Sequence, residues 1–312
     1  MKASSIPIFF LVLLITALSF VPYVYADHRG KSGCVYYLTQ VCFDSEISLC
    51  WDSPRYYRYN VWATPDNKIA YFALIDYNFD VAEKIKKQLQ NITETYNLPH
   101  DYMGLPVTFK HDPLFNVELP DHDGFNKSVW ITLYNQSGYT IKVDIANSTE
   151  KIEDWDAYAD LCIYEALDLY LKGNVSQAKK WLDHVIRMWD GYGIKDREYF
   201  NNGGKYETYK LALLYYANSI INDEPLPFQD ELVDRIWKQQ ASNGGIHTHY
   251  RANGDYAFSD TNVETTALVL YAKIPDPKPS SQAWYEDPKM FGIVMIMSFL
   301  GIIVVKTFYD MR

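Results

Sequence analysis

The chain has 312 residues, of which 48% are hydrophobic and 16% aromatic, so it can bury a sizeable core and is not a disordered protein. Its formal net charge is −10, and no cluster of lysine and arginine lies in the middle of the chain. A phosphate backbone would need such a basic patch, so nucleic acid is excluded as a predicted partner.

The N-terminus has the pattern of a secretory signal. Lys2 precedes an uncharged apolar run over 6–24, and Ala26 supplies the small residue of a cleavage site. We predict a signal peptide over 1–26, with an uncleaved signal anchor as the alternative.

Residues 27–63 are rich in tyrosine and cysteine. Their sequence is compatible with a strand and with a packed cap, and it does not decide between the two. All the cysteines of the chain follow the predicted signal, and an exported protein meets an oxidising compartment. Disulfide bonds are therefore predicted, with the pairing open, for Cys34, Cys42, Cys50 and Cys162.

Helical periodicity characterises the predicted ectodomain, 64–274. Helices that are apolar nearly all round alternate with amphipathic helices that have one charged face. An apolar helix must be enclosed on all sides, so the apolar set is predicted to form an inner layer. The apolar helices are predicted at 68–77, 157–171, 206–221 and 262–272, and the amphipathic ones at 81–92, 178–189 and 232–238.

The first two apolar helices are separated by a longer gap. Prolines at 99, 106, 113 and 120 forbid long helices there, and residues 129–145 predict a hairpin. We expect a small β insertion over 99–150.

The C-terminal part begins with a proline-rich linker, 275–289. The run 290–305 is uncharged and, counted to Tyr309 with Lys306 snorkelling, reaches the length of a membrane span. We predict a transmembrane helix over 290–309 and a cytoplasmic tail over 310–312, with a buried core helix as the alternative.

These ends predict a single-pass protein of the cell membrane with an extracellular N-terminal domain and a cytoplasmic C-terminus. Five N-x-Ser/Thr sequons fall within the exported part and agree with export. The predicted glycosylation sites are Asn91, Asn126, Asn135, Asn147 and Asn174.

Residues 237–245 form the pattern W-x-x-Q-x-x-x-G-G, and an Asp/Thr-rich stretch from Asp260 opens the next predicted helix. This pattern resembles the repeat of the α/α-toroid proteins, the superfamily of terpenoid cyclases and protein prenyltransferases, over about residues 155–272. The resemblance implies a mainly α fold: an incomplete α/α toroid of helical hairpins with a small β insertion, here followed by the C-terminal transmembrane helix. The acidic motif of the cyclases and the zinc ligands of the prenyltransferases have no match, so no activity is implied.

In such a ring, the starts of the inner helices border one end of a central cavity. Carboxylates that converge beside aromatic side chains are typical of sugar hydrolysis, where one acid donates a proton and another activates water or attacks. A capping box of Thr261 and Glu264, and a helix-dipole role for Asp156, are the structural alternatives. The predicted catalytic residues are Glu207, Glu264, Asp156 and Asp260.

The densest polar cluster is the segment 247–251. Its two histidines could hold a metal with Asp260 or act as acid and base, but surface histidines are the alternative, and we predict no metal and no cofactor. His100, His111 and His122 are predicted to be solvated loop residues. The predicted ligand-binding residues are His247, His249, Tyr250, Arg251, Trp155, Tyr192 and Tyr206.

We therefore predict a membrane-anchored cell-surface glycoprotein whose helical-ring ectodomain binds a glycan or an envelope partner. The alternative is an anchored polysaccharide-active enzyme, a glycoside hydrolase or lyase, that uses the carboxylates at the mouth of the ring.

Overall fold

The computed structural model describes residues 29–53, 61–136 and 139–277. About 48% of it is helical and 16% is strand, in three sheets. The strands are β1 (Phe43–Asp44) with β2 (Leu49–Cys50), the sheet of β3 (Val61–Ala63), β5 (Tyr139–Lys151) and β4 (Asn126–Gln136), and β6 (Tyr206–Glu207) with β7 (His249–Tyr250).

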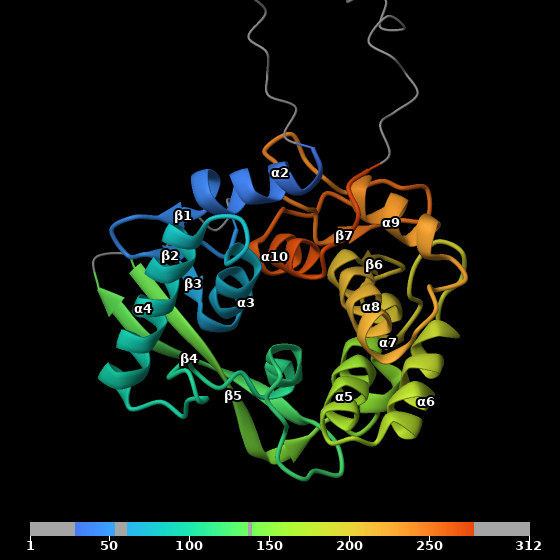
Figure 1. Cartoon of the computed structure of the whole chain (residues 1–312), viewed down its shortest axis with the longest axis horizontal. Coiled ribbons are helices and arrows are strands. Elements are labelled where there is room, and N and C mark those ends of the chain that lie inside the picture. The colour runs from blue at the N-terminus through green and yellow to red at the C-terminus, as the bar shows by residue number, and fades with distance from the viewer. Residues whose placement is uncertain (1–28, 54–60, 137–138, 278–312) are drawn as a thin grey trace, which may run out of the picture. The chain divides into compact units, whose positions relative to one another are not determined.

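Four helices that are buried on most sides lie around the centre of Figure 1: α3 (Thr64–Leu74), α5 (Ala159–Leu171), α8 (Thr208–Ile221) and α10 (Val263–Tyr271). Three amphipathic helices each pack against the inner helix that precedes them: α4 (Phe79–Tyr96), α6 (Val175–Ile186) and α9 (Gln229–Trp237). The predicted helices are thus confirmed, because each apolar face finds the partner that its periodicity requires.

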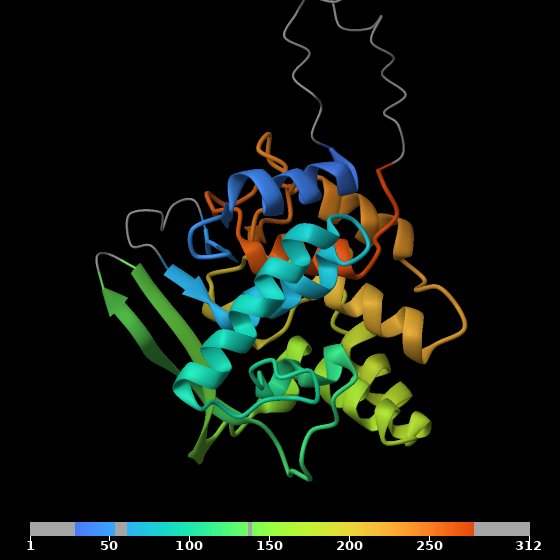
Figure 2. The same cartoon turned by 60° about the vertical axis from the view of Figure 1, so that its left-hand side comes forward.

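The predicted fold class, a mainly α ring with a small β insertion, is wrong. Strand β3 pairs in parallel with β5, with Val61 opposite Thr140, and leads directly into α3. The long hairpin β4–β5 and the 3-10 helix η3 (Phe109–Phe115) therefore close the side between α3 and α5, where a continuous ring would place a helical hairpin (Figures 1 and 2).

A buried lysine fixes the segment before this hairpin. Lys68 on α3 is fully buried, and its Nζ lies 3.0 Å from Asp101 Oδ2 and 3.2 Å from Asp112 Oδ1. It also donates a hydrogen bond to the carbonyl of Pro106 at 3.0 Å. A buried charge must be paired, so these contacts hold η3 and its loop against α3.

The first described helix meets the W-x-x-Q-x-x-x-G-G segment. Helix α2 (Gly30–Tyr36) and the π-helix η1 (Tyr37–Val41) pack against it and against α10. Gln240 accepts a hydrogen bond from Gly30 N at 2.7 Å and donates one to Gly30 O at 2.9 Å. Gly244 has φ +86° and lies against the backbone of Gly33, where a side chain would not fit.

The predictions of a transmembrane helix and of the cell membrane as the location are corrected. No helix among the described residues is long and apolar enough to cross a bilayer. The apolar helices have 9 to 14 residues, and α4, with 18, has a charged face. The predicted signal peptide, 1–26, and the stretch 290–309 lie outside the described residues.

The predicted disulfides are also wrong. Cys34, Cys42, Cys50 and Cys162 are buried, and no disulfide joins any two of them. Cys50 Sγ instead donates to the carbonyl of Leu38 at 3.4 Å, and Cys162 Sγ, on α5, donates to that of Asp156 at 3.2 Å.

Candidate active site

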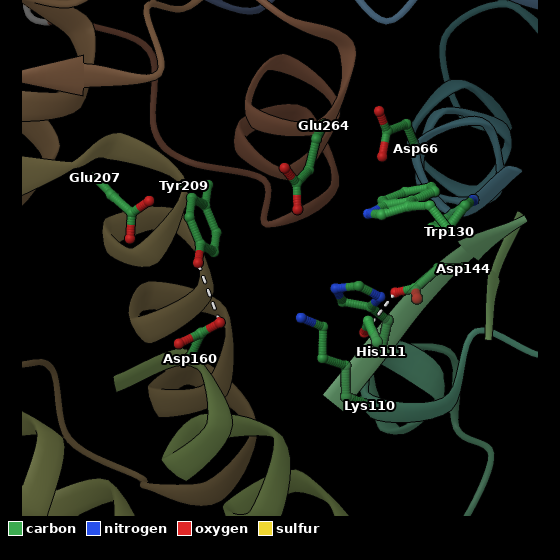
Figure 3. A pocket seen from close by; sticks show the side chains of 11 residues that line it. Asp66, Lys110, His111, Trp130, Asp144, Asp160, Glu207, Tyr209 and Glu264 are labelled. Atoms are coloured by element: carbon green, nitrogen blue, oxygen red, sulfur yellow. Dashed lines mark hydrogen bonds between the residues drawn. The ribbon is translucent and has the colours of Figure 1, made fainter. Parts of the chain in front are cut away.

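A cavity of about 280 Å³ is lined by residues from the N-terminal ends of all four inner helices (Figure 3). Each helix supplies one acid at its start, where the helix dipole favours negative charge. These acids are Asp66 of α3, Asp160 of α5, Glu207 just before α8, and Glu264 of α10.

The rest of the lining comes from η3, the hairpin and the first turns of α3 and α8: Pro65, Lys110, His111, Ser128, Trp130, Asp144 and Tyr209. A second cavity of about 360 Å³ shares Lys110, Asp160, Glu207 and Tyr209 with the first, so the two adjoin. Together they are large enough for a small ligand.

Glu264 lines the cavity and is not part of a capping box. The N-cap of α10 is Asn262, whose Oδ1 accepts the hydrogen bond from Thr265 N at 2.9 Å. Burial raises the pKa of Glu264 to about 7; the charge of Lys110 opposes this increase, and the neighbouring acid Glu207 adds to it. Glu264 therefore keeps a proton through the range where an exposed glutamate has lost it.

Glu207, in contrast to Glu264, is ionised. Its Oε1 lies 3.5 Å from His249 Nε2, and its Oε2 forms an ion pair with Lys210 Nζ. Burial favours the neutral acid, but the hydrogen bond from His249 and the charge of Lys210 outweigh it and lower the pKa of Glu207. Two candidates from separate segments, Glu207 and His249, thus meet because β6 and β7 pair.

Asp160 is likewise ionised. Tyr209 Oη donates to its Oδ2 at 3.1 Å, and Lys210 Nζ lies 3.7 Å from its Oδ1. Burial opposes ionisation, but the charges of Lys210 and Lys110 prevail and lower the pKa of Asp160. Figure 3 shows Asp160 and Glu264 on the same opening, with Tyr209 next to Glu207.

A second protonated carboxyl lies beside Glu264. Burial, together with the charge of Asp52, raises the pKa of Asp66 well above its usual value, and burial also raises the pKa of Asp52. Asp144 lies on β5 opposite Trp130 and accepts a hydrogen bond from Ser128 Oγ at 3.0 Å. Its other oxygen is buried and has no hydrogen-bond partner among the described residues.

His111 was predicted to be a solvated loop residue, and this prediction is wrong. It is buried against Tyr164, with ring centroids 5.1 Å apart, and burial lowers its pKa to about 3, an effect that the charge of Lys110 reinforces. The neutral ring leaves Nδ1 buried without a hydrogen-bond partner in the described part of the chain. Trp130, by contrast, is half exposed at the edge of the cavity.

The remaining predicted catalytic acids do not line the cavity. Asp156 is exposed on the 3-10 helix η4 (Trp155–Ala157), because α5 begins later than predicted and its first-turn acid is Asp160. Asp260 precedes α10, and its backbone carbonyl accepts a hydrogen bond from Thr248 N at 2.9 Å.

Most of the predicted ligand-binding residues form packing contacts. Tyr206 and Tyr250 are buried and stack across β6 and β7, with Tyr250 Oη donating to the carbonyl of Tyr192. His247 stacks on Tyr256, Trp155 packs against Trp181, and Arg251 is exposed. Among the predicted glycosylation sites, Asn91 and Asn174 are exposed, Asn126 begins β4, and the side chains of Asn135 and Asn147 lie outside the description.

Nine of the residues that line the cavity were not predicted from the sequence: Pro65, Asp66, Lys110, His111, Ser128, Trp130, Asp144, Asp160 and Tyr209. Asp66 and Asp160 have the feature for which Glu264 was chosen, because each is an acid in the first turn of an apolar helix. The residues from the hairpin and η3 have no local sequence pattern that would indicate that these segments face the helix starts.

The chain was compared with known proteins at the levels of family, sequence and fold. No family model, curated protein or solved structure matches it.

Proposed function

We propose that the chain hydrolyses glycosidic bonds in this cavity, with Glu264 as the general acid and Asp160 as the ionised carboxylate. The observation that supports this is that two acids lining one cavity have pKa values shifted in opposite directions. Glycoside hydrolysis needs such a pair, because one carboxyl must hold a proton while the other has none.

In the proposed reaction, Glu264 gives its proton to the bridging oxygen as the bond from that oxygen to the anomeric carbon breaks. Water adds to the anomeric carbon, and Asp160 accepts the proton that this water loses. Tyr209 holds Asp160 in place through its hydrogen bond. Trp130, half exposed at the edge, offers an apolar face on which a sugar ring can lie.

A glycan-binding protein without catalysis is the other prediction made from the sequence. It would need aromatic faces and hydrogen-bonding groups, which the cavity also has, but it would not need an acid whose pKa lies near neutrality. Strongly shifted pKa values cluster at catalytic sites, so we favour the enzyme.

The test is to incubate the purified chain with a panel of neutral, amino-sugar and uronic-acid oligosaccharides and to measure new reducing ends. We expect cleavage of at least one class, and Glu264→Gln and Asp160→Asn should each lower turnover at least about 100-fold, the scale of general acid–base catalysis. Glu94→Gln, an exposed acid on α4, is the matched control and should turn over like the unaltered chain.

Two results would contradict the proposal. Binding of an oligosaccharide by calorimetry without any new reducing ends would favour the binding protein. Undiminished cleavage in both cavity variants would place the reaction elsewhere.

A further inference from the structure

Outside the candidate active site, three side chains bring possible metal ligands together. They belong to His122, Glu165 and Asp168, and one possible ligand atom from each lies within 4.8 Å of the other two. His122 Nε2 is 3.4 Å from the glutamate oxygen and 3.9 Å from the aspartate oxygen. Ligands about 2.0–2.1 Å from a tetrahedral zinc ion lie about 3.3 Å apart, so the first distance already fits and the second requires a small movement.

The backbone orients these groups as it orients ligands in metal proteins. Glu165 and Asp168 are three residues apart on α5 and so share one side of the helix. His122 Nδ1 lies 3.1 Å from the carbonyl of Gly124, and when Nδ1 donates its hydrogen there, the lone pair of Nε2 faces the two acids. Leu119 N donates to Asp168 Oδ1 at 2.7 Å and fixes that carboxylate. Such outer contacts are typical of metal ligands.

The surroundings of Glu165 are a second observation that favours cation binding. Among the described residues, Glu165 Oε2 is buried and accepts no hydrogen bond, so its approach to His122 is not a hydrogen bond. Lys172 Nζ lies 2.8 Å from Asp168 Oδ2 and supplies part of the positive charge. Its long side chain reaches solvent and can withdraw when an ion takes its place.

We propose that His122, Glu165 and Asp168 bind one zinc ion. An imidazole nitrogen with two carboxylate oxygens is a donor set that zinc accepts, and three protein ligands leave a fourth position for water. His122 also lines a cavity of about 430 Å³, which gives an ion a way in from solvent. His122 is exposed, as predicted for a solvated loop residue, but no metal was predicted from the sequence.

The test uses the full chain, freed of metal with a chelator and titrated with zinc chloride by calorimetry. We expect one zinc ion per chain, an affinity at least about tenfold weaker in His122→Ala and in Glu165→Gln, and a stronger affinity in Lys172→Gln, which lacks the competing cation. His184→Ala, on α6, is the control and should bind zinc unchanged. Circular dichroism melts show whether each variant is folded.

Absence of binding at millimolar zinc would overturn the proposal. So would binding that persists unchanged in a folded His122→Ala chain, because the ion would then lie elsewhere. Neither result bears on glycoside cleavage, since the ligands are not the residues proposed to carry it.

Discussion

Glu264 and Asp160 line the same cavity but differ in the charges around them. The charges of Lys210 and Lys110 lower the pKa of Asp160, whereas the acids around Glu264 raise its pKa and Lys110 opposes them. The two carboxyls therefore exchange protons with solvent over different ranges of pH. This difference gives the proposed enzyme a defined pH profile.

We expect turnover to decline as the pH rises above about 7, because Glu264 then loses the proton that it must donate. Lys110→Gln removes a charge that favours ionisation of Glu264, so its pKa should rise and the alkaline limb of the rate profile should move to higher pH. The measurement is kcat/KM against pH. Lys87→Gln, on the exposed face of α4, is the control, and an alkaline limb that stays in place in Lys110→Gln would contradict the assignment.

The same carboxyl should limit stability. Its pKa is about 7 in the folded chain against 4.5 as the ordinary value, so the folded state loses stability as the pH rises from the lower to the higher figure. Glu264→Gln avoids this penalty. At about pH 8 we expect the free energy of unfolding of the variant to exceed that of the unaltered chain by up to ~3 kcal/mol, so that the variant unfolds at a higher denaturant concentration. At about pH 4 the two should unfold at nearly the same denaturant concentration. If the variant and the unaltered chain have equal free energies of unfolding at both pH values, Glu264 is well solvated.

At the scale of elements, the N-cap of α10 fixes one of the acids that face the cavity. Asn262 caps α10 and lets the helix begin at Val263, which places Glu264 in the first turn. The cap thus fixes a functional side chain as well as a helix end.

Asn262→Ala should lower the free energy of unfolding by about 0.5–2 kcal/mol, the usual cost of losing a side-chain cap. Asn174 precedes α6 without a side-chain cap hydrogen bond, so Asn174→Ala is the matched control and should cost less. Urea denaturation of both variants makes the comparison. Equal losses would mean that the Asn262 hydrogen bond contributes little.

The element scale is also where prediction from sequence succeeded best. Periodicity located the helices, because an apolar stripe needs a partner wherever the chain runs. It misplaced the start of α5 by two residues, and that small error selected Asp156 instead of Asp160. The parallel pairing of β3 with β5 was missed, since three residues, Val61–Ala63, carry no pattern that distinguishes a strand from a loop.

At the scale of the whole molecule, Gly244 and Gln240 join the first described helix to the last third of the chain. The W-x-x-Q-x-x-x-G-G pattern therefore has a structural role here. The resemblance that it suggested remains a prediction without support from known proteins.

Gly244→Ala should lower the free energy of unfolding by about 1–3 kcal/mol beyond the backbone cost alone, because the new methyl meets the backbone of Gly33. Gly191 has a similar φ, +93° against +86°, and nothing within 4 Å of an added Cβ, so Gly191→Ala isolates the cost of the left-handed backbone. Thermal and denaturant unfolding give both values. Equal costs would mean that α2 moves aside freely.

The packing of α10 against α3 has a consequence for folding during synthesis on the ribosome. Helix α3 ends at Leu74, and α4, which packs against it, follows at once, but α10 begins only at Val263, so most of the chain is synthesised before the α10 side of α3 can be covered. Until then the α10 side of this buried helix stays exposed on the growing chain. We therefore expect premature stop codons upstream of α10 to yield insoluble fragments, not smaller folded ones.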